Sequence, residues 1–142
     1  MENYNEVKNV RGSLHYYLNG YLHRLDGPAI VKGNSEMKWF QNGKQHRSDG
    51  GPAAAYPDGK KEWWQNGKLH RVGAPAVIHK NGTKQYWVNG VRHRLDGPAI
   101  IEADRTKQYW VNGVRHRLDG PAIEDANDPN LDEYWINGEQ IG

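Results

Sequence analysis

The sequence predicts an all-β protein: an elongated, twisted antiparallel meander of about five and a half hairpin repeats, each about 23 residues long. Asn-Gly recurs at positions 19–20, 42–43, 66–67, 89–90, 112–113 and 137–138, in steps of 23 to 25 residues. The stretch KQYWVNGVRHRLDGPAI occurs twice without change, at Lys84–Ile100 and at Lys107–Ile123. No apolar pattern of helical period and useful length is present. These observations indicate a repeated β unit whose copies do the same structural job.

Each Asn-Gly dipeptide lies between apolar alternating segments, which predicts a β-hairpin with a type I′ turn. Around Asn89-Gly90 the expected cross-strand pairs are Val88 with Val91, Trp87 with Arg92, Tyr86 with His93, and Gln85 with Arg94. Alternation then predicts two faces, one with Tyr86, Val88, Val91, His93 and Leu95 and the other with Trp87, Arg92 and Arg94. Pro98 cannot donate to a ladder, so the strand must bend or end there. We therefore expect about two short strands and two turns from each unit.

The repeats divide the chain into a short leader and one repeat domain. We expect residues 1–13 to be an N-terminal leader that caps the edge of the sheet, and residues 14–142 to form a single domain. The last segment, Asp125–Gly142, starts a sixth unit but lacks His-Arg-x-Asp, which indicates a terminal cap. A single hairpin is marginal in water, whereas hairpins in series can share one sheet.

Composition excludes several classes of protein. The absence of Cys rules out disulfides and Cys-based metal sites. Apolar runs are only a few residues long, so no transmembrane segment is expected, and we expect a cytoplasmic protein. The net charge of +2 is too weak to argue by itself for nucleic acid. Six Trp and eight Tyr replace the scarce aliphatic residues as a source of buried area.

The repeat resembles the MORN-type hairpin repeat in its bacterial and viral variant. The resemblance is carried by aromatic-x-Asn-Gly hairpins, from Tyr17-Leu18-Asn19-Gly20 to Trp135-Ile136-Asn137-Gly138, and covers about residues 14–142. The His-Arg-x-Asp-Gly-Pro-Ala element looks like repeats of tailed-phage and giant-virus proteins, but it is absent from the usual MORN consensus. The resemblance implies a scaffold, a protein-binding surface or, in some members, a surface for anionic lipid.

His-Arg-x-Asp is the sharpest chemical feature of the sequence. A His near an Asp could act as a general base held by a carboxylate. The favoured interpretation is structural: Asp closes the bend and pairs with Arg, and His bonds the backbone at that bend. Repeated copies of one dyad lack the asymmetry that catalysis needs, and no Ser, Cys or Thr recurs beside the His as a nucleophile. The residues predicted to be structural are His23, Asp26, His46, Asp49, His70, His93, Asp96, His116 and Asp119.

Metal binding is disfavoured by distance. Matching His residues of neighbouring units should lie about 10 Å apart across the sheet, too far to share a zinc ion. We therefore expect no metal, no cofactor and no catalytic residue.

The aromatic pairs and the Arg residues are the candidates for binding. Trp beside Arg allows cation–π stacking, and a Trp–Arg groove could stack bases or hold phosphates, although packing ladders of a thin sheet explain the same pattern. The candidate binding residues are Arg24, Arg47, Trp64, Arg71, Trp87, Arg92, Arg94, Trp110, Arg115 and Arg117. A small anionic nucleotide suits them better than a long nucleic acid, whose affinity comes from many phosphate contacts.

The favoured function is a non-enzymatic interaction protein, encoded by a phage or virus, that binds and blocks a host factor as an anti-defence or host-takeover inhibitor. Two alternatives stay open: a small-ligand binder that sequesters a nucleotide signal, and a structural scaffold that assembles with itself edge to edge. A host protein is the expected partner. The viral part of this hypothesis rests on the resemblance and not on chemistry.

Overall fold

The computed structural model describes residues 2–142, which are all-β apart from one short 3-10 helix, η1 (Pro129–Leu131). The predicted fold class, an antiparallel meander of hairpins, is confirmed. Contacts divide the chain into two compact units, Met1–Leu69 and His70–Gly142. Among the described residues, no helix has the length and apolar character needed to cross a membrane.

The first unit combines a main antiparallel sheet with short hairpins. Its strands are β1 (Glu6–Val10), β2 (Ser13–Leu18), β3 (Tyr21–Leu22), β4 (Ile30–Val31), β5 (Met37–Lys38), β6 (Phe40–Gln41), β7 (Lys44–Gln45), β8 (Ala54–Ala55), β9 (Lys61–Glu62), β10 (Trp64–Gln65) and β11 (Lys68–Leu69). The main sheet has the order β1-β2-β4-β5-β8-β9, with β3 paired to β2 beside this path. The pairs β6–β7 and β10–β11 form separate hairpins.

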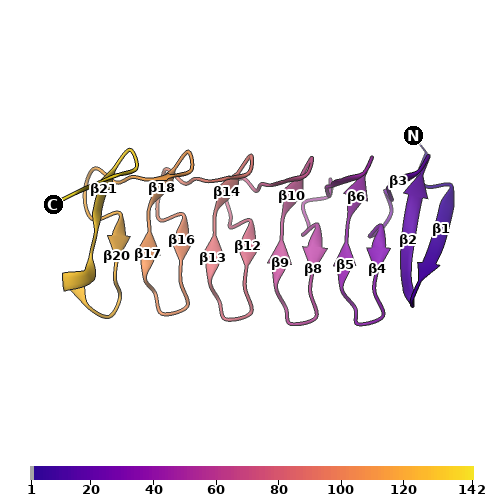
Figure 1. Ribbon diagram of the computed structural model, residues 1–142, viewed down its shortest axis with the longest axis horizontal. Helices are drawn as coiled ribbons and strands as arrows, with labels where there is room; N and C mark the ends of the chain where they lie inside the picture. Colours follow the sequence, from indigo (N-terminus) through magenta and orange to yellow (C-terminus); the bar gives the residue numbers. More distant parts are fainter. Residues whose placement is uncertain (1) are drawn as a thin grey trace. The chain divides into compact units, whose positions relative to one another are not determined.

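The second unit repeats this arrangement. Its strands are β12 (Val77–Ile78), β13 (Lys84–Gln85), β14 (Trp87–Val88), β15 (Val91–Arg92), β16 (Ile100–Ile101), β17 (Lys107–Gln108), β18 (Trp110–Val111), β19 (Val114–Arg115), β20 (Ile123–Glu124), β21 (Tyr134–Ile136) and β22 (Glu139–Ile141). The main sheet runs β12-β13-β16-β17-β20, and β14–β15, β18–β19 and β21–β22 are hairpins. In each unit the hairpins lie at one end of the main-sheet strands and the connecting turns at the other end (Figure 1).

Each repeated Asn-Gly dipeptide forms the turn of a hairpin. The six Asn residues have φ between 49° and 51°, and the Gly residues that follow them have φ between 79° and 85°. Two successive residues with positive φ define the type I′ turn, whose twist matches that of the flanking strands. Gly tolerates this region freely, and Asn tolerates it better than most residues.

The register near Asn89-Gly90 is partly as predicted. Trp87 pairs with Arg92 and Val88 with Val91. The prediction that Gln85 pairs with Arg94 is wrong, because Gln85 lies in β13 of the main sheet, between β12 and β16. The chain leaves the main sheet at Tyr86. Each 23-residue repeat therefore supplies four short strands instead of two: two strands of the main sheet and two strands of a hairpin.

The core is thin and consists mainly of small residues. The Ala that follows Pro in each loop has no exposed surface, at positions 29, 53, 76, 99 and 122. Ala99 shows why the site is tight: its N–H donates to the carbonyl of Gln108 at 2.8 Å, and its carbonyl accepts from the N–H of Tyr86 at 2.7 Å. The backbone is therefore held on both sides of this side chain.

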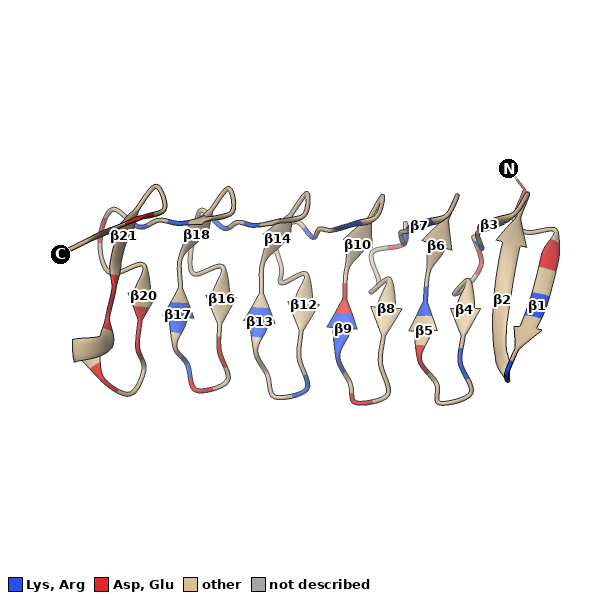
Figure 2. Ribbon diagram, viewed as in Figure 1, with Lys and Arg blue, Asp and Glu red and all other residues tan. Residues whose placement is uncertain are grey.

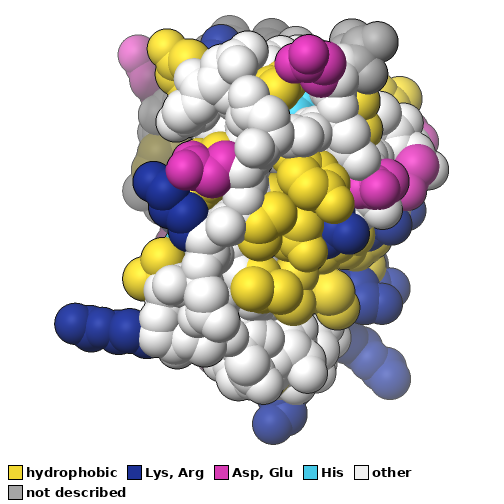
Figure 3. All heavy atoms as spheres, turned by 90° about the vertical axis from the view of Figure 1, so that its right-hand side faces the viewer, with side chains coloured by type: hydrophobic (Ala, Val, Ile, Leu, Met, Phe, Trp, Pro, Cys, Tyr) yellow, Lys and Arg dark blue, Asp and Glu magenta, His cyan; other side chains and the backbone are white. Residues whose placement is uncertain are grey.

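Residues 6–10 of the predicted leader form β1, which pairs along its whole length with β2. All five residues of β1 are exposed, and the unpaired edge includes Val7 and Val10, with 45% and 46% of their surface accessible. Figure 3 looks onto this side and shows hydrophobic side chains gathered between Lys and Arg side chains. Lys8, in an ion pair of 3.7 Å with Glu6, places charge on this edge, a feature that discourages edge-to-edge pairing.

Candidate functional site

A hydrogen bond that links neighbouring repeats occurs five times. The backbone N–H of a turn Asn donates to Nδ1 of the His in the preceding repeat, at 2.9 to 3.1 Å. The pairs are Asn42 with His23, Asn66 with His46, Asn89 with His70, Asn112 with His93 and Asn137 with His116. Nδ1 accepts only in the neutral imidazole that carries its proton on Nε2. The expected backbone partner was the bend after each His, whereas the structure places it in the turn of the following hairpin.

The Gly of the same turn also forms a hydrogen bond to the preceding repeat. Its N–H donates to the carbonyl of the residue just before the His, at 2.9 Å in each case. These bonds join Gly43 to Leu22, Gly67 to Gln45, Gly113 to Arg92 and Gly138 to Arg115. In a hairpin on its own both turn N–H groups would face water, so this pair of bonds is specific to stacked repeats.

The Arg of His-Arg-x-Asp forms hydrogen bonds within the loop of its own repeat. In Arg94, Nη1 donates to the carbonyl of Pro98 at 3.1 Å and Nε donates to Asp96 at 3.0 Å. The guanidinium lies 4.0 Å from the centroid of the Tyr86 ring. The prediction that Arg94 shares a face with Trp87 is therefore wrong. The strand alternation ends before Arg94, whose N–H donates to the carbonyl of Trp110 in the next hairpin.

The same Arg geometry recurs in other units. The guanidinium of Arg24 lies 4.0 Å from the Tyr16 ring, that of Arg47 3.9 Å from Trp39, and that of Arg117 3.9 Å from Tyr109. A guanidinium over an aromatic face gains electrostatic attraction as well as packing. In Arg71, Nη1 donates to the carbonyl of Pro75 at 3.1 Å, although Gly73 stands where other units have Asp.

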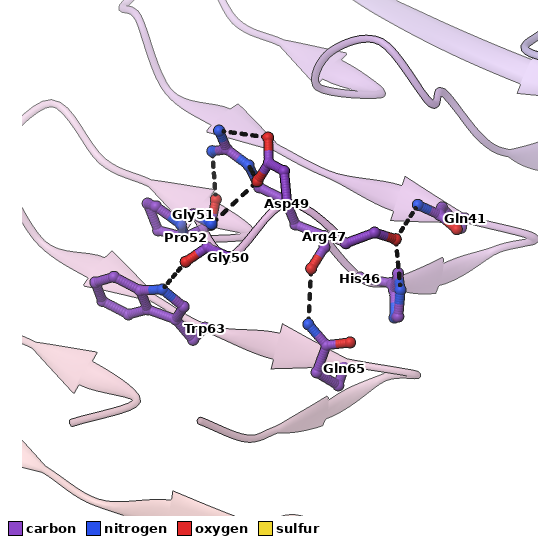
Figure 4. A network of polar contacts seen from close by, with 10 residues as sticks. Gln41, His46, Arg47, Asp49, Gly50, Gly51, Pro52, Trp63 and Gln65 are labelled. Carbon is purple, nitrogen blue, oxygen red and sulfur yellow. Dashed lines mark hydrogen bonds and ion pairs between the residues drawn. The ribbon is translucent and has the colours of Figure 1, made fainter. Parts of the chain in front are cut away.

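Figure 4 shows this network around Arg47. Nε of Arg47 donates to Asp49 at 2.6 Å, and Nη1 donates to the carbonyl of Pro52 at 2.9 Å. Asp49 also accepts the backbone N–H of Gly51 at 3.0 Å. The bonds from Arg47 and from Gly51 hold the pKa of the Asp49 carboxyl below its usual value. Gln65 donates to the carbonyl of Arg47 at 2.7 Å, so the following repeat also supports the loop.

Trp and Arg alternate in the hairpins of the second unit. The Arg92 guanidinium lies 5.1 Å from the rings of both Trp87 and Trp110, and that of Arg115 lies 5.3 Å from Trp110 and 5.0 Å from Trp135. These Arg side chains cover ring faces that a stacking base would need. These three Trp, and Trp64 of the first compact unit, are also anchored through Nε1, which donates to the side chain two residues earlier: Trp64 to Glu62, Trp87 to Gln85, Trp110 to Gln108 and Trp135 to Glu133.

The position between Arg and Asp is the one exposed apolar position of the element. Val72, Leu95 and Leu118 have 81%, 80% and 77% of their surface accessible. Two hollows lie beside them, of about 500 Å³ and 360 Å³. Sequence reasoning missed this surface. The signal was present, because this position is Leu or Val in four of five loops although Arg precedes it in all five and Asp follows it in four.

Within residues 2–142 no cluster of three or more His, Asp or Glu side chains could hold a metal ion. The predicted structural residues, His and Asp, and the Arg residues predicted to bind are distributed over successive loops instead of converging on one point. Each loop uses its imidazole and its guanidinium in backbone hydrogen bonds. The arrangement can therefore hold repeats together and present side chains.

Comparison with protein-family models, curated proteins and solved structures found no match for this chain. Fold and site together define a class: an all-β hairpin-repeat protein whose recurring polar residues build the frame. The frame leaves apolar side chains exposed at matching places in successive loops.

Proposed function

We propose that this chain is a non-enzymatic interaction protein that binds a partner protein in the bacterial cytoplasm. The observation that carries this proposal is the set of exposed apolar residues at one position of successive loops, Val72, Leu95 and Leu118. Large exposed apolar side chains that gather at one surface are typical of protein-binding sites. The polar groups beside them are engaged in the frame, so they offer a rigid support and not a reactive group.

Charge supports a protein partner more than a long nucleic acid. Figure 2 shows Lys and Arg interspersed with Asp and Glu along the strands and turns of each unit. In the second unit, for example, Lys84 and Lys107 of the sheet are accompanied by Glu102 and Asp104 in the connecting turn. Nucleic acids draw most of their affinity from many like contacts to phosphate, which a mixed surface does not offer.

The identity of the partner as a host factor, and its inhibition, rest on the resemblance to MORN-type repeats of phage and giant-virus proteins. That resemblance makes bacterial proteins the first candidates to test. A second function, sequestration of a nucleotide through Trp and Arg, is supported by the ladder of Trp87, Arg92 and Trp110. It requires a base to displace an Arg from a ring face, and for this reason we rank it second.

The test is affinity purification from bacterial lysate with the tagged full chain, followed by reconstitution with the purified candidate. A host protein that forms a complex of defined stoichiometry in size-exclusion chromatography would support the proposal. A bound nucleotide, visible as a raised ratio of absorbance at 260 to 280 nm, would favour sequestration instead. Recovery of the bait alone, as an assembly larger than one chain, would favour a structural scaffold.

A further inference from the structure

The two hollows of the second unit are copies of one site. The larger is lined by Leu95, Leu118 and the ring of Tyr109, and the smaller by Val72, Leu95 and the ring of Tyr86. Leu95 lines both. Each hollow thus has an aromatic residue, a Val of the hairpin and two apolar side chains from successive loops, so a ligand that fits one hollow fits the next.

The polar groups of this surface favour a basic ligand. The side chains of Asp96 and Asp119 are 87% and 88% exposed, whereas those of their partners Arg94 and Arg117 are only 23% and 21% exposed. Each carboxylate uses Oδ1 for its Arg. Among the described residues nothing donates to Oδ2, so an acceptor oxygen remains for a ligand.

From these features we infer that the two hollows bind one segment of a partner protein through two apolar side chains, with a Lys or Arg beside the anchor in the larger hollow. This inference rests on the proposed function and names the surface and the chemistry of its partner. Charge complementarity decides the occupant, because the larger hollow has two exposed carboxylates, Asp96 and Asp119, beside Arg94 and Arg117. The smaller hollow has one carboxylate, Asp96, beside Arg71 and Arg94, because Gly73 stands in place of the second Asp. The ligand therefore binds in one orientation.

Repeat geometry gives the spacing of the anchors. The equivalent strands β13 and β17 lie two strands apart in the sheet order, which corresponds to about 10 Å at the usual strand separation. Residues three apart in a polyproline II segment, or seven apart in an α-helix, lie on one face at about this distance. The bound segment should show one of these two spacings.

The experiment is a selection of random 12-residue peptides displayed on phage against the immobilised full-length protein. Selected peptides should contain two apolar residues, three or seven apart, with a Lys or Arg beside one of them. Their affinity is then measured for three proteins: the wild type, the double variant L95S/L118S, and the matched control V91S/V114S. Val91 and Val114 are 40% and 41% exposed and line neither hollow.

We expect affinity to fall at least about tenfold in L95S/L118S and to stay unchanged in V91S/V114S, since burial of one Leu side chain corresponds to a factor of about ten or more. D119N should weaken binding by a few-fold and reduce its salt dependence. Peptides that bind L95S/L118S normally would overturn the inference but leave a protein-binding function intact. Acidic peptides, or no selected peptide at all, would also overturn it, and the purification from lysate would still decide the proposed function by itself.

Discussion

Replacement of a recurring His by Ala tests whether the hydrogen bond between repeats stabilises the protein. In His93→Ala the N–H of Asn112 loses the Nδ1 acceptor that it has at 2.9 Å. This bond is exposed, so water replaces the lost acceptor and the cost is close to the net value of one hydrogen bond, about 1 kcal/mol. In His23→Ala the lost side chain is only 1% exposed. There the N–H of Asn42 loses its partner in a partly buried place, and we expect a cost of about 2–4 kcal/mol.

The assay is equilibrium unfolding in urea followed by Trp fluorescence, with the midpoint compared at a constant m-value. His93→Asn is the informative companion, because an amide oxygen can accept the N–H of Asn112 where Ala cannot. We expect His93→Asn to recover more than half of the stability that His93→Ala loses. His79→Ala is the control, since His79 accepts no Asn N–H from a turn.

Two outcomes would refute this reasoning. The first is equal destabilisation by His93→Ala and His93→Asn, which would mean that the ring packs and its acceptor contributes nothing. The second is a smaller effect at His23 than at His93, because the cost must rise as the bond is removed from water. The first result would return the recurring His to a space-filling role.

Three further predictions concern the loop, the core and pH. A Cβ on Gly97 would lie 2.8 Å from the guanidinium carbon of Arg94, so Gly97→Ala should lower the free energy of unfolding in urea by about 1–2 kcal/mol. In the control Gly33→Ala the new Cβ meets only the carbonyl oxygen of Gly12, at 3.9 Å, and the change should be nearly neutral. Ala99→Val overfills a site with no exposed surface and should cost about 1–3 kcal/mol, while the same change at exposed Ala103 should cost little. Burial lowers the pKa of His46 below 6.5, so the unfolded chain binds the proton more readily than the folded chain. The contribution of neutral His46 to the free energy of unfolding is therefore fully present above pH 6.5 and is lost as the pH falls through the folded-state pKa. Melting curves between pH 7.5 and pH 5 measure this loss, and a His46→Asn variant should flatten it.

Sequence reasoning predicted the repeat, the turns and the inner part of each hairpin, because these depend on residues close together in the chain. Asn-Gly with positive φ closes a hairpin whatever its surroundings, and Val88 must then face Val91. The outer part could not be predicted in the same way. The partner of Gln85 is decided by Ile100, which returns after the bend, and a local pairing rule contains no information on that return.

The site was less predictable than the fold for a related physical reason. His-Arg-x-Asp looks like one chemical motif in the sequence, yet its side chains act in two directions. Arg94 and Asp96 close their own loop, whereas His93 accepts a hydrogen bond from the turn at Asn112 in the next repeat. Spacing along the chain shows that these residues recur together, but not that they serve different neighbours.

These contacts explain why His and Arg occur in all five loops while the residue that follows Arg changes. Mutation of the His removes a bond to the next repeat, so its cost extends to two repeats of the array. Mutation of the Arg, or of the Gly packed against it, disturbs the loop of its own repeat. Val72, Leu95 and Leu118 at this position are 81%, 80% and 77% exposed, so their replacement changes mainly what the surface offers. Ser48 at the same position instead hydrogen-bonds to Gln41 and His46. Leu25, Ser48, Val72, Leu95 and Leu118 occupy this position in the five loops. Specificity for a partner can therefore vary at this position without loss of the fold.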